Sequence, residues 1–250
     1  MKNVKHLINL LFIACFIFTT AISCDKTDDP GGDGQSAGTL KDADGNSYNT
    51  VKIGTQVWMK ENLKTTKYND GSNIPNVTDN SKWDELTSGA YCNYDNLEKN
   101  ADTYGRLYNW YALNTGKLAP AGWHVPTDAD CTILEEYLMA NGFNFDGTTD
   151  RRMFAKAMAS KTNWKSSEEE GSPGFSPENN NSSGFSALPG GKRTYRGFES
   201  LGETGIWWTY DEVEYESIYC ILINYEDKYF SRLIGYDLRA DGYSVRLIKD

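Results

Sequence analysis

Few side chains of this sequence have the type and spacing that nucleophilic or acid–base chemistry requires. Of its two histidines, His6 lies in the apolar N-terminal segment, so His124 is the one imidazole of the remaining chain. A Ser-His-Asp arrangement needs a nucleophile on a strained turn, and nothing in the sequence marks one. The adjacent acids at 168–170 indicate a solvated charged loop, not the separated carboxylates of glycoside hydrolysis. We predict no catalytic residue, and we expect His124 to help fix the start of a helix.

The cysteines offer little further chemistry. Five are present, and Cys15 and Cys24 lie in the N-terminal segment, which leaves Cys92, Cys131 and Cys220. Their spacings fit no zinc motif. Three thiols allow at most one internal disulfide, so we predict that at least one is a buried free thiol.

Oxygen ligands for calcium occur at two places, and calcium is the only cofactor that the sequence leaves open. The run from Asp42 to Asn46 has the alternate spacing with which a calcium loop begins, but the twelfth position is Ile53 where a bidentate acid is required. A turn is therefore the better interpretation there. The second candidate is Glu178 with Asn179, because hard cations bind carboxylate and amide oxygens.

Aromatic side chains are the groups best suited to bind a ligand. The chain has 16 Tyr and 7 Trp residues, and such rings either build a core or stack on sugars. Trp164, Tyr195, Trp207 and Trp208 are our candidates for sugar stacking, although we expect most rings of the chain to lie in the core. Because successive side chains of a strand point to opposite faces, we expect one ring of the Trp207 and Trp208 pair to be exposed.

Cys24 carries the clearest predicted modification. Basic Lys2 and Lys5 precede an apolar run at 7–18, and small residues lead into Cys24. This pattern resembles a bacterial lipoprotein signal, in which residues 1–23 are removed and Cys24 is lipidated. The apolar run is short of the roughly 20 residues of a membrane span, so a retained anchor helix is the less favoured alternative. We predict a lipid-anchored protein of the outer membrane, exposed at the cell surface.

Composition and charge define the rest of the chain. Residues 24–38 are acidic and glycine-rich without apolar periodicity, so we predict a flexible tether, followed by one domain at 39–250. The acidic start also resembles signals that send lipoproteins to the cell surface, and solvation of a linker is the alternative interpretation. A formal net charge of -10 has the wrong sign for phosphate backbones, so nucleic acid is excluded as a partner.

Local patterns predict strands at both ends of this domain and helices between them. Asp44 and Gly45 mark the turn of a hairpin at 39–59. Thr127 and Asp130 form the signature of a helix start, and the apolar stripe of Ile133, Leu134, Tyr137 and Leu138 continues to a stop at 141–142.

Later segments complete the prediction. A second helix is expected at 150–161, and a long irregular loop rich in Gly, Pro, Ser and Asn is expected at 168–191. Loops of this length are uncommon unless they carry function, so we expect a binding surface there. Short strands are predicted at 206–208, 217–225, 229–234 and 243–248.

Several segments, in this order, resemble one bacterial family. They are residues 44–46, 51–54, 58–63, 67–71, 104–110, 122–127, 183–191, 207–208 and 242–250. The pattern is similar to the Fibrobacter succinogenes major paralogous domain, found in bacterial lipoproteins and surface proteins. That family resembles the C-type lectin fold and the formylglycine-generating-enzyme fold. The resemblance implies an α+β, C-type lectin-like domain with paired termini, two helices, short antiparallel strands and a long irregular loop region.

Some residues depart from these patterns. Cys131 stands where the family usually has tryptophan, and Leu247 stands where a cysteine is expected, which would leave Cys92 without that partner. The calcium and sugar motif of true C-type lectins is absent, and Glu178 with Asn179 matches it only in scrambled order. The paired catalytic cysteines of formylglycine-generating enzymes are also not visible, because only Cys220 lies in the late strand region.

The function that the resemblance implies is a non-catalytic envelope lipoprotein. Its lectin-like domain would bind a glycan or another surface protein through the region 168–210. Two alternatives remain at this point. One is an enzyme of the formylglycine-generating-like fold, and the other is a purely structural envelope protein.

Overall fold

The computed structural model describes residues 34–213, 217–236 and 238–250. The described residues belong to one compact unit. The predicted signal segment and Cys24 lie outside the described residues. Strand β1 begins at Ser36, within the predicted tether, so regular structure starts slightly earlier than expected.

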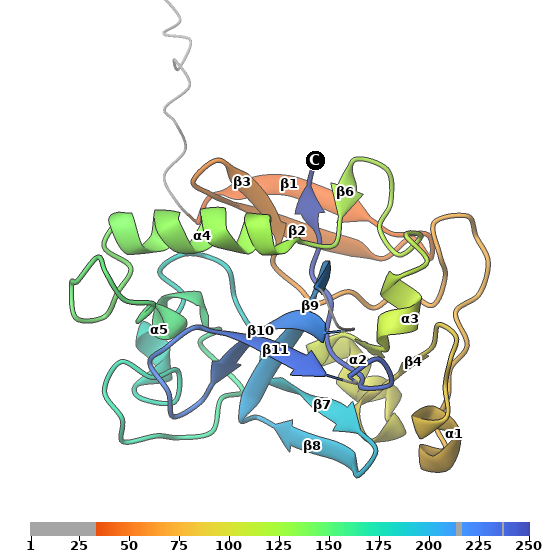
Figure 1. Ribbon diagram of the computed structural model, residues 1–250. Coiled ribbons are helices and arrows are strands. Elements are labelled where there is room, and N and C mark those ends of the chain that lie inside the picture. The colour runs from red at the N-terminus through yellow and green to blue at the C-terminus, as the bar shows by residue number, and fades with distance from the viewer. Residues whose placement is uncertain (1–33, 214–216, 237) are drawn as a thin grey trace, which may run out of the picture. The chain divides into compact units, whose positions relative to one another are not determined.

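The unit is an α+β domain in which strands predominate, as predicted (Figure 1). Its helices are α1 (Asn80–Asp84), α2 (Glu98–Tyr104), α3 (Trp110–Leu113), α4 (Asp128–Ala140) and α5 (Ala155–Met158), with 3-10 turns η1 (Tyr94–Asn96) and η2 (Pro177–Asn179). Its strands are β1 (Ser36–Lys41), β2 (Ser47–Ile53), β3 (Gln56–Met59), β4 (Tyr91–Cys92), β5 (Leu107–Tyr108), β6 (Trp123–His124), β7 (Gly190–Thr194), β8 (Gly197–Leu201), β9 (Thr204–Val213), β10 (Ser217–Asn224), β11 (Ser231–Tyr236) and β12 (Ile248–Lys249).

One sheet joins the first hairpin to the end of the chain. Its strand order is β1-β2-β3-β12-β6, and Ile248 pairs with Trp58 on one side and with His124 on the other. The sheet forms the upper layer of Figure 1, with the C-terminus emerging beside β6. The first and last segments of the domain are therefore paired, as the resemblance implied.

The predicted hairpin turn is present and uses the acidic residues of the calcium-like run. Asp42 Oδ1 accepts hydrogen bonds from the backbone N–H groups of Asp44 and Asn46, each at 2.9 Å, and its Oδ2 accepts from Tyr48. Gly45 adopts a positive φ of 85°, which glycine tolerates without strain. The Asp42 carboxylate is thus occupied by the turn itself.

Helix α4 follows its sequence signals closely. Thr127 Oγ1 accepts from the Asp130 N–H at 3.2 Å, and Asp130 Oδ2 accepts from the Thr127 N–H at 2.8 Å, which completes a capping box. Leu134 and Leu138 are buried as predicted. The prediction for Ile133 was wrong, because 47% of this side chain is exposed. The buried face of α4 includes Cys131, which packs in the same core as residues of β2, β3 and β10.

Other element predictions were only partly right. The second helix shrinks from 150–161 to α5, because Arg152 O accepts from Phe230 N and Met153 O accepts from Phe145 N outside any helix. The described residues contain five α-helices, not two, since α1, α2 and α3 are too short to show a clear period. The predicted strand at 243–248 is reduced to isolated bridges and β12.

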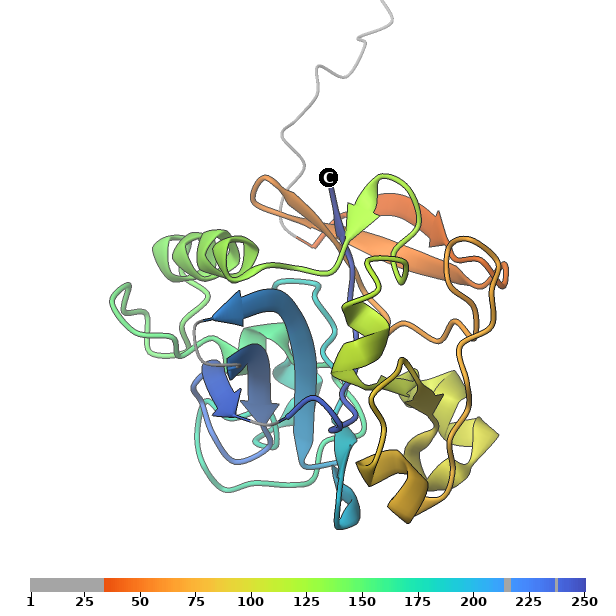
Figure 2. The same cartoon turned by 45° about the vertical axis from the view of Figure 1, so that its right-hand side comes forward.

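Strand β9 separates two hydrophobic cores. It belongs to the antiparallel sheet β11-β10-β9, which curls beneath α4 (Figure 2). Trp208 packs into the core that contains Trp110, Tyr243 and Val245. Trp207, on the opposite face of the strand, packs into the core that joins α4 to β2 and β3. Both faces of β9 are therefore covered.

Candidate functional site

The segments that resemble the known family meet at one buried amide, Asn62. Its Oδ1 accepts from Trp207 Nε1 at 2.8 Å and from Arg246 Nε at 2.9 Å. Its Nδ2 donates to Tyr104 O at 2.7 Å and to Ser244 Oγ at 3.2 Å. These residues come from four of the separate segments, so those segments specify internal packing.

Arg246 is the most unusual member of this network, because its charge is fully buried. Nη2 donates to Ser186 O at 2.8 Å, Nη1 donates to Phe185 O, and the guanidinium lies 4.4 Å from the Phe185 ring centroid. No ion pair involves Arg246 within the described residues, and burial lowers its pKa to about 9. Carbonyl oxygens and ring faces therefore stabilise this cation from inside the fold.

Three of the four rings proposed for sugar stacking are buried. Trp207 and Trp208 are 1% and 0% exposed, and Trp164 is 8% exposed with its Nε1 donating to Ser160 Oγ at 3.1 Å. The expectation that one ring of the Trp207 and Trp208 pair is exposed was wrong. Alternation does send the two rings to opposite faces, but each face of β9 meets a core.

Tyr195 is the proposed ring that does reach the surface. It lies in the turn between β7 and β8, is 63% exposed, and accepts a hydrogen bond on its hydroxyl from Arg196 Nε at 2.7 Å. It borders a hollow of about 430 Å³ that also includes Glu199 and Asp241. Burial raises the pKa of Asp241, and this hollow carries charges of both signs.

His124 has both ring nitrogens engaged. Nδ1 lies 2.7 Å from Asp250 Oδ1, and Nε2 lies 3.1 Å from Asp130 Oδ2. The ring thus connects β6 to the helix start at Asp130 and to the end of the β12 segment. Neither nitrogen is left to take a proton from a substrate, and this geometry supports the structural role predicted for His124.

The three cysteines of the described domain are buried free thiols, which confirms the prediction that at least one would be. Burial raises the pKa of Cys92 to about 11 and that of Cys220 to about 12. Burial also raises the pKa of Cys131 well above its usual range. Since the thiolate is the reactive form, these side chains behave as small apolar groups.

The calcium candidates do not form a clustered ligand set. Glu178 and Asn179 are exposed on η2, and the buried neighbour Asn180 donates its amide N–H groups to Ser160 O and Pro173 O. Across the described residues, no group of three or more His, Cys, Asp or Glu side chains is placed to hold a metal ion.

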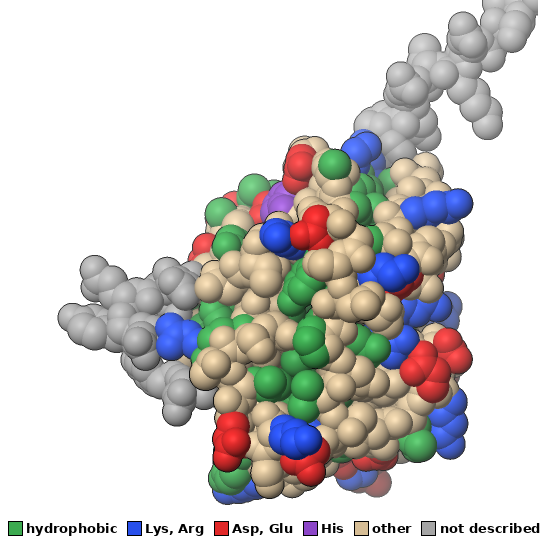
Figure 3. All heavy atoms as spheres, turned by 90° about the vertical axis from the view of Figure 1, so that its right-hand side faces the viewer, with side chains coloured by type: hydrophobic (Ala, Val, Ile, Leu, Met, Phe, Trp, Pro, Cys, Tyr) green, Lys and Arg blue, Asp and Glu red, His purple; other side chains and the backbone are tan. Residues whose placement is uncertain are grey.

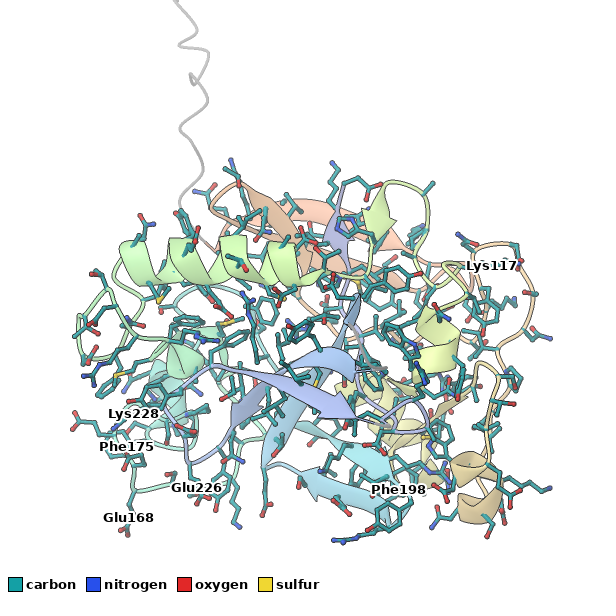
Figure 4. All side chains as sticks on the ribbon, viewed as in Figure 1. Lys117, Glu168, Phe175, Phe198, Glu226 and Lys228 are labelled. Atoms are coloured by element: carbon teal, nitrogen blue, oxygen red, sulfur yellow. The ribbon has the colours of Figure 1, made fainter. Side chains whose placement is uncertain are left out.

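The long loop instead borders a hollow of about 360 Å³ beside α5. Its walls come from three separate stretches of the chain: the segment after α4, helix α5 and the loop itself. The residues are Gly142, Phe143, Asn144, Phe145, Lys156, Ala157, Glu170, Gly171, Phe175, Asn179 and Ser182. We call this site the long-loop hollow. Figure 4 shows Phe175 at the same end of the molecule as Glu168, which projects from the loop.

Lys156 fixes the loop that forms one wall of the long-loop hollow. Its Nζ donates to Phe175 O, to Ser176 O at 3.0 Å and to Asn180 Oδ1 at 2.8 Å. Burial lowers the pKa of Lys156, and the charge of Glu178 opposes that shift. One ammonium group therefore holds three acceptors of an otherwise irregular segment.

The long-loop hollow has an exposed aromatic ring, and two buried polar atoms without partners lie close to it in the sequence. Phe145 is 38% exposed and packs directly against Gly171, where an added Cβ would lie 2.5 Å from the ring. Asn144 is 4% exposed, and its Oδ1 has no hydrogen-bond partner. The buried Ser172 hydroxyl, next to Gly171, also lacks a partner. Apolar faces and unsatisfied polar groups thus lie together.

A family model described as the Fibrobacter succinogenes major domain matches residues 51–249. The chain belongs to this family. The match covers most of the sequence and confirms the resemblance inferred from the separate segments. No match to the chain was found among curated proteins or among solved structures. Within the described residues, no helix has the length and apolar character needed to cross a bilayer.

Within the Fibrobacter succinogenes major domain, the resemblance segments and the long-loop hollow are different parts of the chain. The segments supply the Asn62 network, whereas none of the residues that line the hollow falls within them. The sequence analysis predicted a binding surface in the loop from its length and composition, and Asn179, which it named as a calcium candidate, lines the hollow. It missed Phe145 and Asn144, because nothing in a short aromatic stretch after a helix predicts that it will pack beside α5 and the long loop.

Proposed function

We propose that this protein is a non-catalytic, lipid-anchored envelope protein whose domain binds a glycan in the long-loop hollow. The observation that carries the proposal is the exposed Phe145 ring in a hollow that is also lined by the exposed polar side chains of Glu170 and Asn179. A sugar ring offers one apolar face for an aromatic ring and hydroxyl donors around its edge. The two features of the hollow fit these two parts of a sugar.

The charges of the hollow favour a neutral ligand. The Lys156 ammonium already donates to three protein oxygens, so it offers little to an anion. Glu170, which lines the hollow and is exposed, would repel an anionic group and can accept from a hydroxyl. A neutral saccharide therefore meets fewer unfavourable interactions than a phosphate or an acidic peptide does.

A lectin-like fold is part of this proposal. In the lectin-like arrangement that the family resemblance implies, the chain ends are paired and a long loop region carries the ligand. The described domain has a paired β2, β3 and β12, and it has a long irregular segment before β7. These features support the proposal at the level of architecture.

The surroundings of the His and Cys side chains in the described residues fit the binding role that we propose. The nitrogens of His124 both face carboxylates, and the thiols of Cys92, Cys131 and Cys220 are buried with raised pKa values. Lipidation at Cys24 would place the domain in the cell envelope, at the outer membrane and facing outward, where polysaccharides are abundant.

A glycan array or polysaccharide pull-down with the purified full chain tests the function. We expect a signal that Phe145→Ala lowers by about tenfold or more, because the stacking ring is removed. Tyr195→Ala is the matched control, since it removes an exposed ring from a different hollow. A signal that Tyr195→Ala abolishes and Phe145→Ala leaves intact would move the site to the β7–β8 turn. No signal on any neutral glycan would refute the proposal.

A further inference from the structure

A second hollow, about 240 Å³ in volume, lies beside His124 and differs in character from the long-loop hollow. Its walls are mostly apolar and include Leu113, Leu118, Trp123 and Val125. Tyr210 of β9 closes one side. In Figure 3 the histidine (purple) lies at the edge of the face shown, next to hydrophobic and acidic side chains. We call this site the His124 hollow.

Tyr210 presents an aromatic face at the surface of the His124 hollow. The side chain is 41% exposed, and its ring stacks on the buried Trp110 ring with centroids 5.8 Å apart and an interplanar angle of 26°. Its backbone N–H donates to Pro126 O at 2.8 Å, which fixes the strand beside the start of α4. The ring is therefore held in place before any ligand arrives.

Two carboxylates lie next to the polar lining residues of this hollow, although neither lines it. Asp130 and Asp250 flank His124, which lines the hollow itself. Asp211 follows Tyr210 in β9, and its Oδ2 accepts from the Asp128 N–H. Burial and the charges of Asp128 and Asp130 raise the pKa of Asp211, which shows how closely these acids are grouped.

Within the described residues, Arg232 pairs with acids of α4, whereas Asp130 and Asp250 contact His124. Arg232 Nη1 lies 2.7 Å from Asp128 Oδ1 and its Nε lies close to Glu135, so its charge is already paired. His124 is shared between Asp130 and Asp250. Within the described residues, neither Asp130 nor Asp250 forms an ion pair with a Lys or Arg side chain, and the whole chain carries a formal net charge of -10. The local field favours a positive ligand.

We propose that the His124 hollow binds a small organic cation, an ammonium group carried on an apolar body of about one ring. The apolar walls would bury the body, and the carboxylates with the face of Tyr210 would stabilise the charge. The volume lies below the roughly 300–1,000 Å³ of sites for larger ligands, so the ligand is small. Thr127 also lines the hollow, but its hydroxyl already donates to Asp130 Oδ2 at 2.6 Å, which leaves few groups for a sugar.

Calorimetric titration of the full chain with three isosteric probes tests this inference. The probes are 2-phenylethylammonium, 2-phenylethanol and 3-phenylpropionate. We expect the cation to bind with a Kd of about 0.1 to 1 mM, the alcohol about tenfold more weakly, and the carboxylate not at all. Added salt should weaken binding of the cation, since the attraction is screened. Equal binding of alcohol and cation, or no binding of the cation, would overturn the proposal.

Two variants locate the site. Tyr210→Ala should weaken binding of the cation by about tenfold, whereas Tyr229→Ala, which removes an exposed ring beside a different hollow, should leave it unchanged. Asp250→Asn covers the case in which Tyr210→Ala fails to fold, because Asp250 is a largely exposed surface carboxylate. Asp250→Asn should weaken binding of the cation and leave binding of the alcohol unchanged. Unchanged affinity of either folded variant for the cation would contradict the assignment.

Discussion

At the scale of single residues, several polar and charged side chains with chemical potential serve the structure of the domain. Asn62, Arg246 and Trp207 form one buried network, and His124 joins two carboxylates. Side chains of these types are common in functional sites, so their types alone would make them functional candidates. In the fold each is satisfied by protein atoms, and the exposed ring of Phe145 lines the hollow where we place a ligand.

The Asn62 network gives a prediction about stability. Asn62→Ala removes the acceptor shared by Trp207 Nε1 and Arg246 Nε, so a buried charge loses one of its partners. We expect the free energy of unfolding to fall by about 3 kcal/mol, measured by urea denaturation. The control is Asn69→Ala, an exposed amide that donates only to Ala119 O and should cost less than about 1 kcal/mol. Equal effects of the two variants would contradict this role.

At the scale of elements, irregular segments are held by specific side chains. The loop before β7 has no regular structure except η2, yet its backbone is tied down at several points. Lys156 supplies three of these bonds from α5, and Asn180 supplies two more from within the loop. Satisfied polar groups therefore order a segment that has little apolar surface to bury.

Removing the Lys156 anchor should loosen the loop and leave the rest of the domain folded. In Lys156→Met, three acceptors lose their donor, so we expect cleavage by a protease within 168–182 to become about tenfold faster. Limited proteolysis with mass spectrometry of the fragments measures this rate. Lys165→Met is the control, because Lys165 pairs only with the exposed Glu203 and the face of Tyr225. If both variants resist cleavage as the parent does, Lys156 is not the anchor.

At the scale of the whole molecule, the domain has paired ends and separate hollows in which ligands could bind. The five-stranded sheet joins residues near the start of the domain to its last strand. The long-loop hollow and the His124 hollow share no lining residues, so the two proposed ligands would not compete for one surface. A domain tethered by a lipid could present both at once.

Attachment to the envelope gives a prediction for the intact protein in bacteria. Cys24→Ala removes the thiol that would carry the lipid, so we expect the protein to leave the membrane fraction and the detergent phase. Cell fractionation and metabolic labelling with a fatty acid measure the change. Cys15→Ala is the control, since Cys15 lies in the segment that would be removed. Membrane association that survives Cys24→Ala would favour a retained anchor helix.

Local chemistry in the sequence determined much of the fold. The Asp44 and Gly45 turn, the capping box of Thr127 and Asp130 and the ordered family segments could be identified directly, because each depends on neighbouring residues or on a familiar pattern. Among the predictions that failed, the full-length second helix and the burial of Ile133 failed because contacts from distant strands and loops override local preference.

Only the tertiary structure decided which surfaces are open. Alternation along β9 correctly separated Trp207 from Trp208, but it could not show that a second core covers the other face. The long-loop hollow combines Phe145, Lys156 and Phe175, which are brought together by loops whose paths no periodicity encodes. A sequence pattern predicts the direction in which a side chain points. Whether that side chain is buried depends on which distant segments of the chain pack against it.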